Sequence, residues 1–185
     1  MPRAVFATLA MLAVSIVLCT AQQVDPLIAQ HSQPTPKAIS AQASPTVTED
    51  KAAEQELLDL ANQRRREAGA PALRLDTNLS NAARAHARLM VERRQLSHQF
   101  DGEPLLMPRL LETGLRLVHV GENVAFNSTV EKAFDALMQS PPHRRNLLDP
   151  SFNSAGFAAF WSNQRLYVVQ DFAHRLPEIV PASKR

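Results

Sequence analysis

Residues 140–148 read Ser-Pro-Pro-His-Arg-Arg-Asn-Leu-Leu, and they divide the chain into a helical part before them and a strand-rich part after them. The pair Pro141-Pro142 cannot continue the interior of a helix, because proline lacks a backbone N–H and its ring clashes with the preceding turn. Residues 155–161 and 166–172 are rich in aromatic and aliphatic side chains, with a polar four-residue loop between them, which indicates a β hairpin. Helices followed by a hairpin predict an α+β domain built in layers.

The first helix of the domain is expected to begin near Glu49, with Thr48 as its N-cap. Gly69 and then Pro71 stop it, since glycine favours the position after a helix and proline cannot continue one. Residues 64–66 are three arginines that fall where this helix should turn a polar face outward. We therefore interpret the cluster as a solvated face rather than a binding patch.

The second helix starts after Asp76 or Thr77 and runs to about Arg94, because apolar side chains recur at helical spacing throughout this segment. His86 lies on or beside the apolar stripe. We interpret it as a packed, hydrogen-bonded histidine and not as a ligand. A short helix is expected at 104–112.

A third long helix follows an extended or irregular segment at 115–126. Ser128 or Thr129 is expected to cap its start, and it ends near Gln139. Glu131 has the capping-box spacing from Ser128, which supports a helix start at this point.

The charge balance argues against a nucleic-acid partner. The 185 residues include 20 Lys and Arg and 18 Asp and Glu, so the formal net charge is only +2. There is no long basic run with interleaved aromatic residues and no nucleic-acid-binding motif. A content of 45% hydrophobic and 21% charged residues is that of a globular domain.

The N-terminus predicts export. Arg3 precedes an almost wholly apolar run at 4–18, which is typical of a secretory signal peptide. This run is shorter than the roughly 20 apolar residues that span a membrane. We expect a signal peptide at 1–21, cleaved after Ala21, and a secreted protein, extracellular or periplasmic, without a transmembrane segment in the mature chain. An uncleaved anchor is the alternative.

Cys19 is the only cysteine, and its place at the end of the apolar run raises the possibility of a lipoprotein signal. Leu18 argues against lipidation, because lipoprotein signals usually carry a small residue there. Cleavage after Ala21 would leave no cysteine, so the mature fold would depend on its core without disulfides.

Composition divides the remaining chain into three parts. Residues 22–50 are rich in Pro, Gln, Ser and Ala, with no sustained period, and are expected to be a disordered linker. Residues 51–175 form the predicted domain. Residues 176–185 form a polar tail.

Three segments place a titratable residue beside a structure breaker, where loops can converge on a cleft: residues 96–98, 121–125 and 140–148. From them we predict that His98, Glu122 and His143 share one site. Each residue also has a structural interpretation, since a histidine after a helix can simply interact with the helix dipole.

The order and spacing of these segments resemble the bacterial SCP-type branch of the CAP superfamily, the cysteine-rich secretory, antigen 5 and pathogenesis-related-1 proteins. The resemblance covers about Glu54 to Ala173 and includes the pattern Ser-Pro-x-His-Arg-x-Asn-Leu-Leu at 140–148. It implies a three-layer α-β-α sandwich with a surface cleft.

In many CAP proteins two histidines and two glutamates line this cleft and can bind a divalent metal. His98, Glu122 and His143 match three of the four, whereas Ser140 stands where the second glutamate is expected. The resemblance thus implies a site for zinc or another divalent ion, weaker than one with both carboxylates. The expected cleft residues are His98, Glu122, His143, Ser140, Asn123 and Asn146. The two asparagines are expected to bond loop backbones and hold the cleft walls.

The resemblance favours a secreted, non-catalytic binding module for a lipid, glycan or protein ligand. One alternative is a metal-dependent hydrolase that uses the same cleft, with an activated water held among His98, Glu122 and His143. Another is a cell-envelope structural or adhesive protein, which would need retention through Cys19.

Overall fold

The computed structural model describes residues 46–178, and none of their helices is long and apolar enough to span a membrane. The elements are β1 (Thr48–Glu49), α1 (Lys51–Glu67), β2 (Arg74–Leu75), α2 (Thr77–Arg93), α3 (Leu106–Leu111), β3 (Leu117–Asn127), α4 (Val130–Gln139), α5 (Pro141–Leu148), β4 (Ser154–Ser162) and β5 (Arg165–Arg175). The predicted signal peptide at 1–21 with Cys19, the predicted linker up to residue 45 and residues 179–185 of the predicted tail lie outside the described residues.

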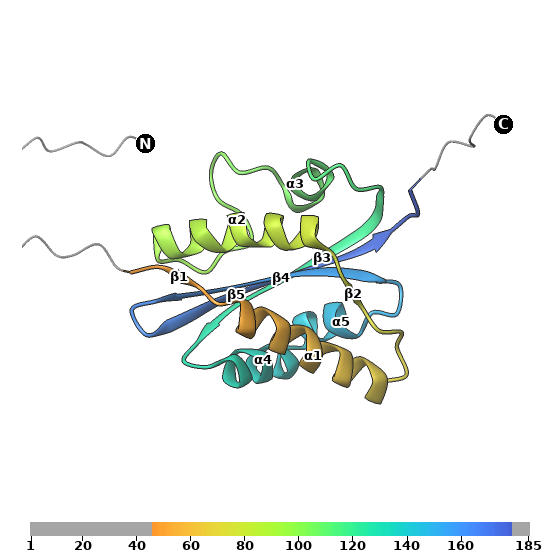
Figure 1. Cartoon of the computed structure of the whole chain (residues 1–185), viewed down its shortest axis with the longest axis horizontal. Helices are drawn as coiled ribbons and strands as arrows, with labels where there is room; N and C mark the ends of the chain where they lie inside the picture. The colour runs from red at the N-terminus through yellow and green to blue at the C-terminus, as the bar shows by residue number, and fades with distance from the viewer. Residues whose placement is uncertain (1–45, 179–185) are drawn as a thin grey trace, which may run out of the picture. The chain divides into compact units, whose positions relative to one another are not determined.

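A single sheet forms the middle layer of the domain. Its strands follow the order β1-β4-β5-β3 with antiparallel pairing, and β2 pairs with β4 in parallel. Helices α2 and α3 cover one face of the sheet, and α1, α4 and α5 cover the other (Figure 1). The predicted α+β class and the three-layer α-β-α arrangement are confirmed.

Apolar side chains pack against both faces of the sheet. Phe157 and Phe172 pack with Leu57 of α1 and Phe134 of α4, and Val169 belongs to a second buried cluster under α2. Burial on both faces explains why β4 is almost continuously apolar instead of alternating with polar residues.

Helix α1 begins at a different cap from the predicted one. The carboxylate of Asp50 accepts hydrogen bonds from the backbone N–H of Ala53 and from the indole N–H of Trp161, both at 2.9 Å. Thr48 instead lies in β1, where it pairs with Trp161 of β4. The prediction of Thr48 was wrong because this short strand, which lies in the range assigned to the linker, depends on pairing with a distant strand.

The caps of α2 and α4 fall within the predicted alternatives. Asp76 caps α2 by accepting two backbone N–H groups of its first turn. Thr129 caps α4 and accepts from the N–H three residues later. Because the N-cap of α4 is Thr129 and not Ser128, the capping box proposed for Glu131 is not formed.

The prolines at 141–142 end α4, as predicted, but they also start α5. Proline suits the first positions of a helix, where its missing N–H would have no partner within the helix. The hairpin is likewise tighter than the predicted four-residue loop. Only Asn163 and Gln164 form the turn, both with positive φ, and the strands extend to Ser162 and Arg165.

Helix α2 lies directly on β4 at Gly156. A Cβ atom at this position would lie 2.1 Å from the carbonyl carbon of Leu79 and 2.2 Å from the nitrogen of Ser80. Glycine is therefore required for the close approach of α2, and α2 leads into the loop that carries His98.

Arg65 is fully buried between α1 and the end of α5. Its guanidinium donates to four backbone carbonyls, those of Pro71 at 2.7 Å, Leu147 at 2.8 Å, Asp149 at 2.9 Å and Phe152 at 3.0 Å. The interpretation of all three arginines at 64–66 as a solvated face was therefore wrong for Arg65. The spacing of polar and apolar residues alone could not show that this arginine donates hydrogen bonds to the backbone carbonyls at the end of another helix.

Replacing Arg65 with methionine should destabilise the fold by about 3 kcal/mol or more, because buried carbonyls such as those of Leu147 and Phe152 would lose their donors. The matched control is Arg64→Met. The Arg64 side chain is exposed and pairs with Glu67 on the surface, so its removal should cost within about 0.5 kcal/mol. Urea unfolding of both variants measures the difference, and similar losses would contradict the assigned role of Arg65.

Candidate functional site

Glu122 lies in the middle of β3, and its side chain is 2% exposed. Its Oε1 accepts a hydrogen bond from Nδ1 of His98 at 2.8 Å. Its Oε2 accepts from Nη2 of Arg109, a residue of α3. Both carboxylate oxygens are thus engaged, one by the candidate histidine and one by a buried guanidinium.

Arg109 connects Glu122 to a second buried carboxylate. Its Nη1 donates to Oε1 of Glu103 at 2.9 Å. The same oxygen lies 2.7 Å from Nδ1 of His86, whose Nε2 lies 2.8 Å from the carbonyl oxygen of Ser97. His86 is therefore a packed, hydrogen-bonded residue, as predicted, and it supports the loop that contains His98.

His98 and His143 lie side by side at the surface of this buried cluster. Their ring centroids are 6.3 Å apart, with an angle of 34° between the ring planes. The side chain of His98 is 56% exposed, and His143 is half-buried in the first turn of α5. The structure therefore brings His98 into contact with Glu122 and places the His143 ring next to the His98 ring.

The surroundings of the two imidazoles separate their pKa values. The hydrogen bond with Glu122 raises the pKa of His98 above its ordinary value, against an opposing effect of burial. Burial lowers the pKa of His143, and the nearby charge of His98 lowers it further. The pair thus combines an imidazole that favours its protonated form with one that favours its neutral form.

The two predicted asparagines join α5 to β3. Asn123 donates to the carbonyl oxygen of His143 at 3.0 Å, and Asn146 donates to that of Glu122 at 3.1 Å. Asn146 also donates to Oδ1 of Asn123 at 3.1 Å. These bonds join the backbones of α5 and β3 on both sides of the site.

Ser140 joins the end of α4 to the start of α5. Its backbone carbonyl accepts from Arg144 at 2.9 Å, and its hydroxyl makes no capping bond in the described part of the chain. At the place where the resemblance implied a second glutamate, the chain therefore supplies no carboxylate.

Sequence reasoning missed three charged residues of the cluster: Glu103, Arg109 and Asp171. Asp171 lies in β5 directly opposite Glu122, and it is fully buried. Burial raises its pKa well above the ordinary value, and the charge of Glu122 adds to this effect. An acidic residue inside a strand predicted from apolar composition was the available signal.

The residues present do not fit a divalent ion bound through Glu122. Both of its oxygens already accept hydrogen bonds, and the adjacent positive charge of Arg109 opposes a cation. Residues 46–178 contain no group of three or more His, Cys, Asp or Glu side chains that could hold a metal. Glu122 therefore does not fit as a direct ligand of a divalent ion in this arrangement, and the metal site that the resemblance implied stays a prediction.

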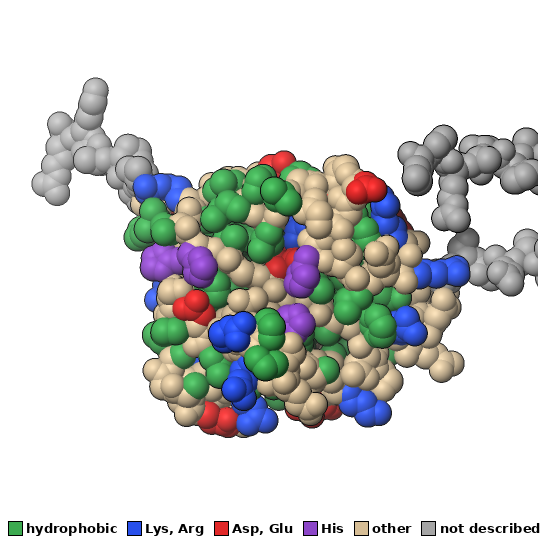
Figure 2. Space-filling model, turned by 180° about the vertical axis from the view of Figure 1, so that it is seen from behind, with side chains coloured by type: hydrophobic (Ala, Val, Ile, Leu, Met, Phe, Trp, Pro, Cys, Tyr) green, Lys and Arg blue, Asp and Glu red, His purple; other side chains and the backbone are tan. Residues whose placement is uncertain are grey.

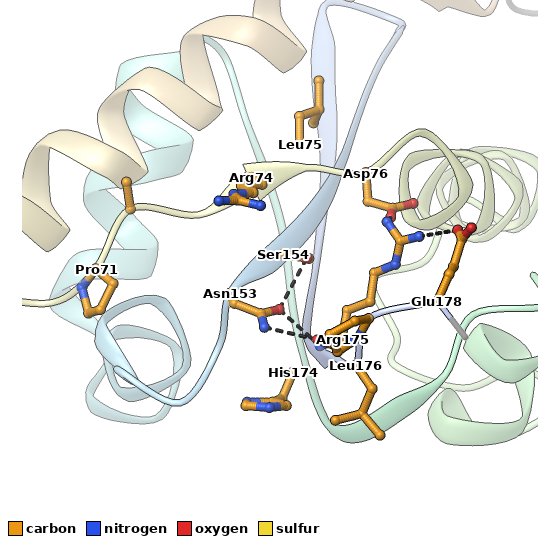
Figure 3. A pocket seen from close by; sticks show the side chains of 12 residues that line it. Pro71, Arg74, Leu75, Asp76, Asn153, Ser154, His174, Arg175, Leu176 and Glu178 are labelled. Atoms are coloured by element: carbon orange, nitrogen blue, oxygen red, sulfur yellow. Dashed lines mark hydrogen bonds and ion pairs between the residues drawn. The ribbon is translucent and has the colours of Figure 1, made fainter. Parts of the chain in front are cut away.

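Histidine side chains lie in two groups on one face of the domain, with acidic and basic side chains beside them (Figure 2). A surface pocket of about 700 Å³ lies elsewhere and is lined by none of the predicted site residues. Within it, Arg175 donates to Asp76 at 2.9 Å and to Glu178 at 2.7 Å (Figure 3). The guanidinium of Arg175 is thus held by the protein's own carboxylates.

Comparisons with known proteins place these features in a family context. The model of the cysteine-rich secretory protein family matches residues 58–172. The curated protein YkwD of Bacillus subtilis, described as uncharacterized, is 31% identical over 119 residues, which is 60% of this chain and 46% of that protein. The chain therefore spans less than half the length of this relative.

Solved structures show the same fold. An extracellular protein containing an SCP domain from Bacillus anthracis superposes with a TM-score of 0.61 at 26% identity, over 66% of this chain and 40% of that one. An outer surface protein from Borrelia burgdorferi superposes with a TM-score of 0.67 at 19% identity, over 72% of this chain and 100% of that one.

Replacing Glu122 with glutamine should lower the pKa of His98, because the largest cause of its elevation is removed. In the unmodified protein, NMR titration of the imidazole C–H signals should show His98 titrating above its ordinary value of 6.5 and His143 below it. Glu131→Gln, on the exposed surface of α4, is the matched control and should leave both titrations unchanged. Coincident titration of the two histidines would contradict the assigned environments.

The raised pKa of His98 also determines the direction in which the stability of the fold changes with pH. Since the pKa of His98 is raised on folding, its bond to Glu122 contributes stability that is fully present below the unfolded value and is lost as pH rises through the folded value. The difference in the free energy of unfolding between the protein and Glu122→Gln should therefore shrink above pH 6.5.

Proposed function

The chain belongs to the cysteine-rich secretory protein family, and from this premise we propose that it is an exported, non-catalytic binding protein whose ligand contacts His98 and His143. Export is supported by Arg3 and the apolar run at 4–18. It also agrees with the descriptions of two similar structures as an extracellular and an outer surface protein.

The observation that carries the proposal is the engagement of Glu122. With Nδ1–H of His98 directed at this carboxylate, the remaining ring nitrogen, Nε2, is the atom left to meet a ligand. Glu122 acts as an anchor that fixes the orientation of the imidazole. A side chain that is exposed on its outer side and fixed on its inner side suits recognition of a ligand's polar group.

The charge around the two histidines favours a ligand with an anionic or hydrogen-bond-accepting group. His98 favours its protonated form, and the N-terminus of α5, which favours negative charge, lies at His143. Arg144 and Arg145 follow in the same helix and are exposed. A lipid, glycan or protein that presents a carboxylate, phosphate or sulfate has this chemistry.

Catalysis is less well supported by the same geometry. The hydroxyl of Ser97, next to His98, donates to the carbonyl of Gln99 at 2.6 Å and accepts from the N–H of that residue. Glu122 is neutralised by Arg109 and so is not positioned to activate water. The hydrolase alternative would need a nucleophile or an ion at Nε2 of His98.

The binding proposal is tested with small anionic probes. Glucuronate and glycerol phosphate should shift the imidazole signals of His98 in NMR titrations, whereas neutral glucose and glycerol should not. His98→Gln combined with His143→Gln should abolish the effect on the remaining signals of the site. Equal responses to charged and neutral probes, or none to either, would contradict the proposal.

Zinc distinguishes the binding module from a metal site. Because Glu122 is engaged by Arg109, isothermal calorimetry should show no micromolar zinc binding at these histidines. His98→Ala combined with His143→Ala is the control for zinc bound elsewhere. Micromolar binding that disappears in this variant would make the pair a metal site and would favour the hydrolase alternative.

A further inference from the structure

The pocket of about 700 Å³ lies where β2 meets the end of β5. Its wall combines polar groups with apolar side chains, among them Leu75 and Leu176. This volume is within the range of pockets that hold ligands in other proteins. Because none of the predicted site residues lines the pocket, an occupant here is separate from the ligand proposed for His98 and His143.

Strand β2, which forms one wall of the pocket, has an open outer edge. The N–H of Arg74 donates to the carbonyl of Asn153 at 3.1 Å, and that of Asp76 donates to the carbonyl of Ala155 at 2.8 Å. Both bonds are directed at β4. The backbone groups of successive residues in a strand point to opposite edges, so the N–H and C=O of Leu75 point away from β4. Neither group has a hydrogen-bond partner among residues 46–178.

Asparagine side chains close two neighbouring backbone positions. Asn62 of α1 accepts from the N–H of Leu73 at 2.7 Å and donates to its carbonyl at 3.1 Å. Asn153 accepts from the N–H of Arg175 at 2.9 Å and donates to its carbonyl at 3.0 Å (Figure 3). A side-chain amide thus takes the place of a partner strand at both residues. Leu75 is 50% exposed and has no such cover within the described part of the chain, so its backbone is open to another chain.

Arg74 adds an unpaired positive charge to this edge. It is exposed, lines the pocket, and forms no ion pair or side-chain hydrogen bond with any described residue. The other charged groups of the pocket are already engaged, since Arg175 pairs with Asp76 at 2.9 Å and with Glu178 at 2.7 Å. Nδ1 of His174 lies 2.7 Å from a backbone carbonyl oxygen. An occupant therefore meets one available guanidinium, and guanidinium groups bind carboxylates well.

We propose that the outer edge of β2 and the pocket beside it bind an extended, acidic peptide segment of a partner protein. The peptide backbone pairs with the N–H and C=O of Leu75 as an added strand, which is a recurring mode of peptide recognition. A carboxylate of the peptide bonds to Arg74, and alternate side chains enter the pocket. Since this interface uses no residue of the histidine site, the inference goes beyond the proposed function and does not depend on it.

An NMR titration of the protein with the acetylated peptide Val-Thr-Val-Thr-Glu tests the pairing. The probe favours an extended backbone and carries two carboxylates. The amide signal of Leu75 should shift to saturation, whereas the amides of Leu73 and Arg175, already bonded to asparagines, should shift less. Methylation of two adjacent central amides of the peptide removes donors on both of its edges and should abolish the shift. No shift at Leu75, or equal shifts with the methylated peptide, would overturn the proposal.

Leu75→Pro removes the outward N–H. Proline is tolerated at an edge where the N–H faces away from the sheet, so the bonds of β2 to β4 should remain while peptide binding is lost. Leu75→Val keeps the N–H and is the matched control, which should bind like the unmodified protein. If the proline variant does not fold, the methylated peptide still tests the same pairing. Equal binding by the two variants would overturn the proposal.

Arg74→Gln tests the contact with a carboxylate. This change should weaken binding of the acidic peptide about tenfold, because a charge-assisted hydrogen bond is lost. Binding of the corresponding neutral peptide, with Gln and a C-terminal amide, should be unchanged. Arg64→Gln, outside the pocket in α1, is the matched control. Equal losses for both peptides, or no loss for either, would overturn the assignment of Arg74.

A second copy of the chain is the other candidate partner for an open strand edge. A shift of the Leu75 amide that depends on protein concentration in the absence of peptide would identify it and would overturn the choice of a peptide partner. Failure of glucuronate and glycerol phosphate to bind at His98 would count only against the proposed function, because the peptide is detected at Leu75.

Discussion

The position of α5 depends on the buried guanidinium of Arg65. Its bonds to the carbonyls of Leu147, Asp149 and Phe152 satisfy the end of α5 and the loop that follows, where a helix would otherwise leave acceptors unpaired. The other end of the same helix carries His143. A charged side chain of α1 therefore anchors the C-terminal end of α5, and the asparagine bonds hold the rest of the helix against β3.

The register of β3 against β5 has an equally direct effect on the chemistry. It places Glu122 opposite Asp171 on the face covered by α2 and α3, in a cluster with few compensating charges. Like charges at directly opposite positions of a sheet are unfavourable, and the guanidinium of Arg109 beside Glu122 offsets part of this repulsion. The same carboxylate accepts a hydrogen bond from His98, so the register of β3 also positions the partner of this imidazole.

Local signals in the sequence were sufficient for much of this architecture. The cap at Asp76 and the turn at 163–164 are local features, because they involve only residues next to them in the sequence. The start of α2 and the hairpin therefore lie close to their predicted positions. The roles of Arg65 and Asp171 depend on partners far along the chain. A pattern of polar and apolar residues does not specify such partners, so periodicity assigned Arg65 to the surface and gave Asp171 no role.

The same limit applies to the chemistry of the histidine pair. A motif with two histidines and a glutamate suggests a metal site, yet the ability of Glu122 to bind an ion depends on what already occupies its oxygens. Arg109, from a short helix without a distinctive motif, occupies one of them and supplies the charge that an ion would have supplied. Arg109 thereby makes Glu122 a support for His98, and in the proposed function it is the outward nitrogen of His98, with the neighbouring imidazole, that meets the ligand.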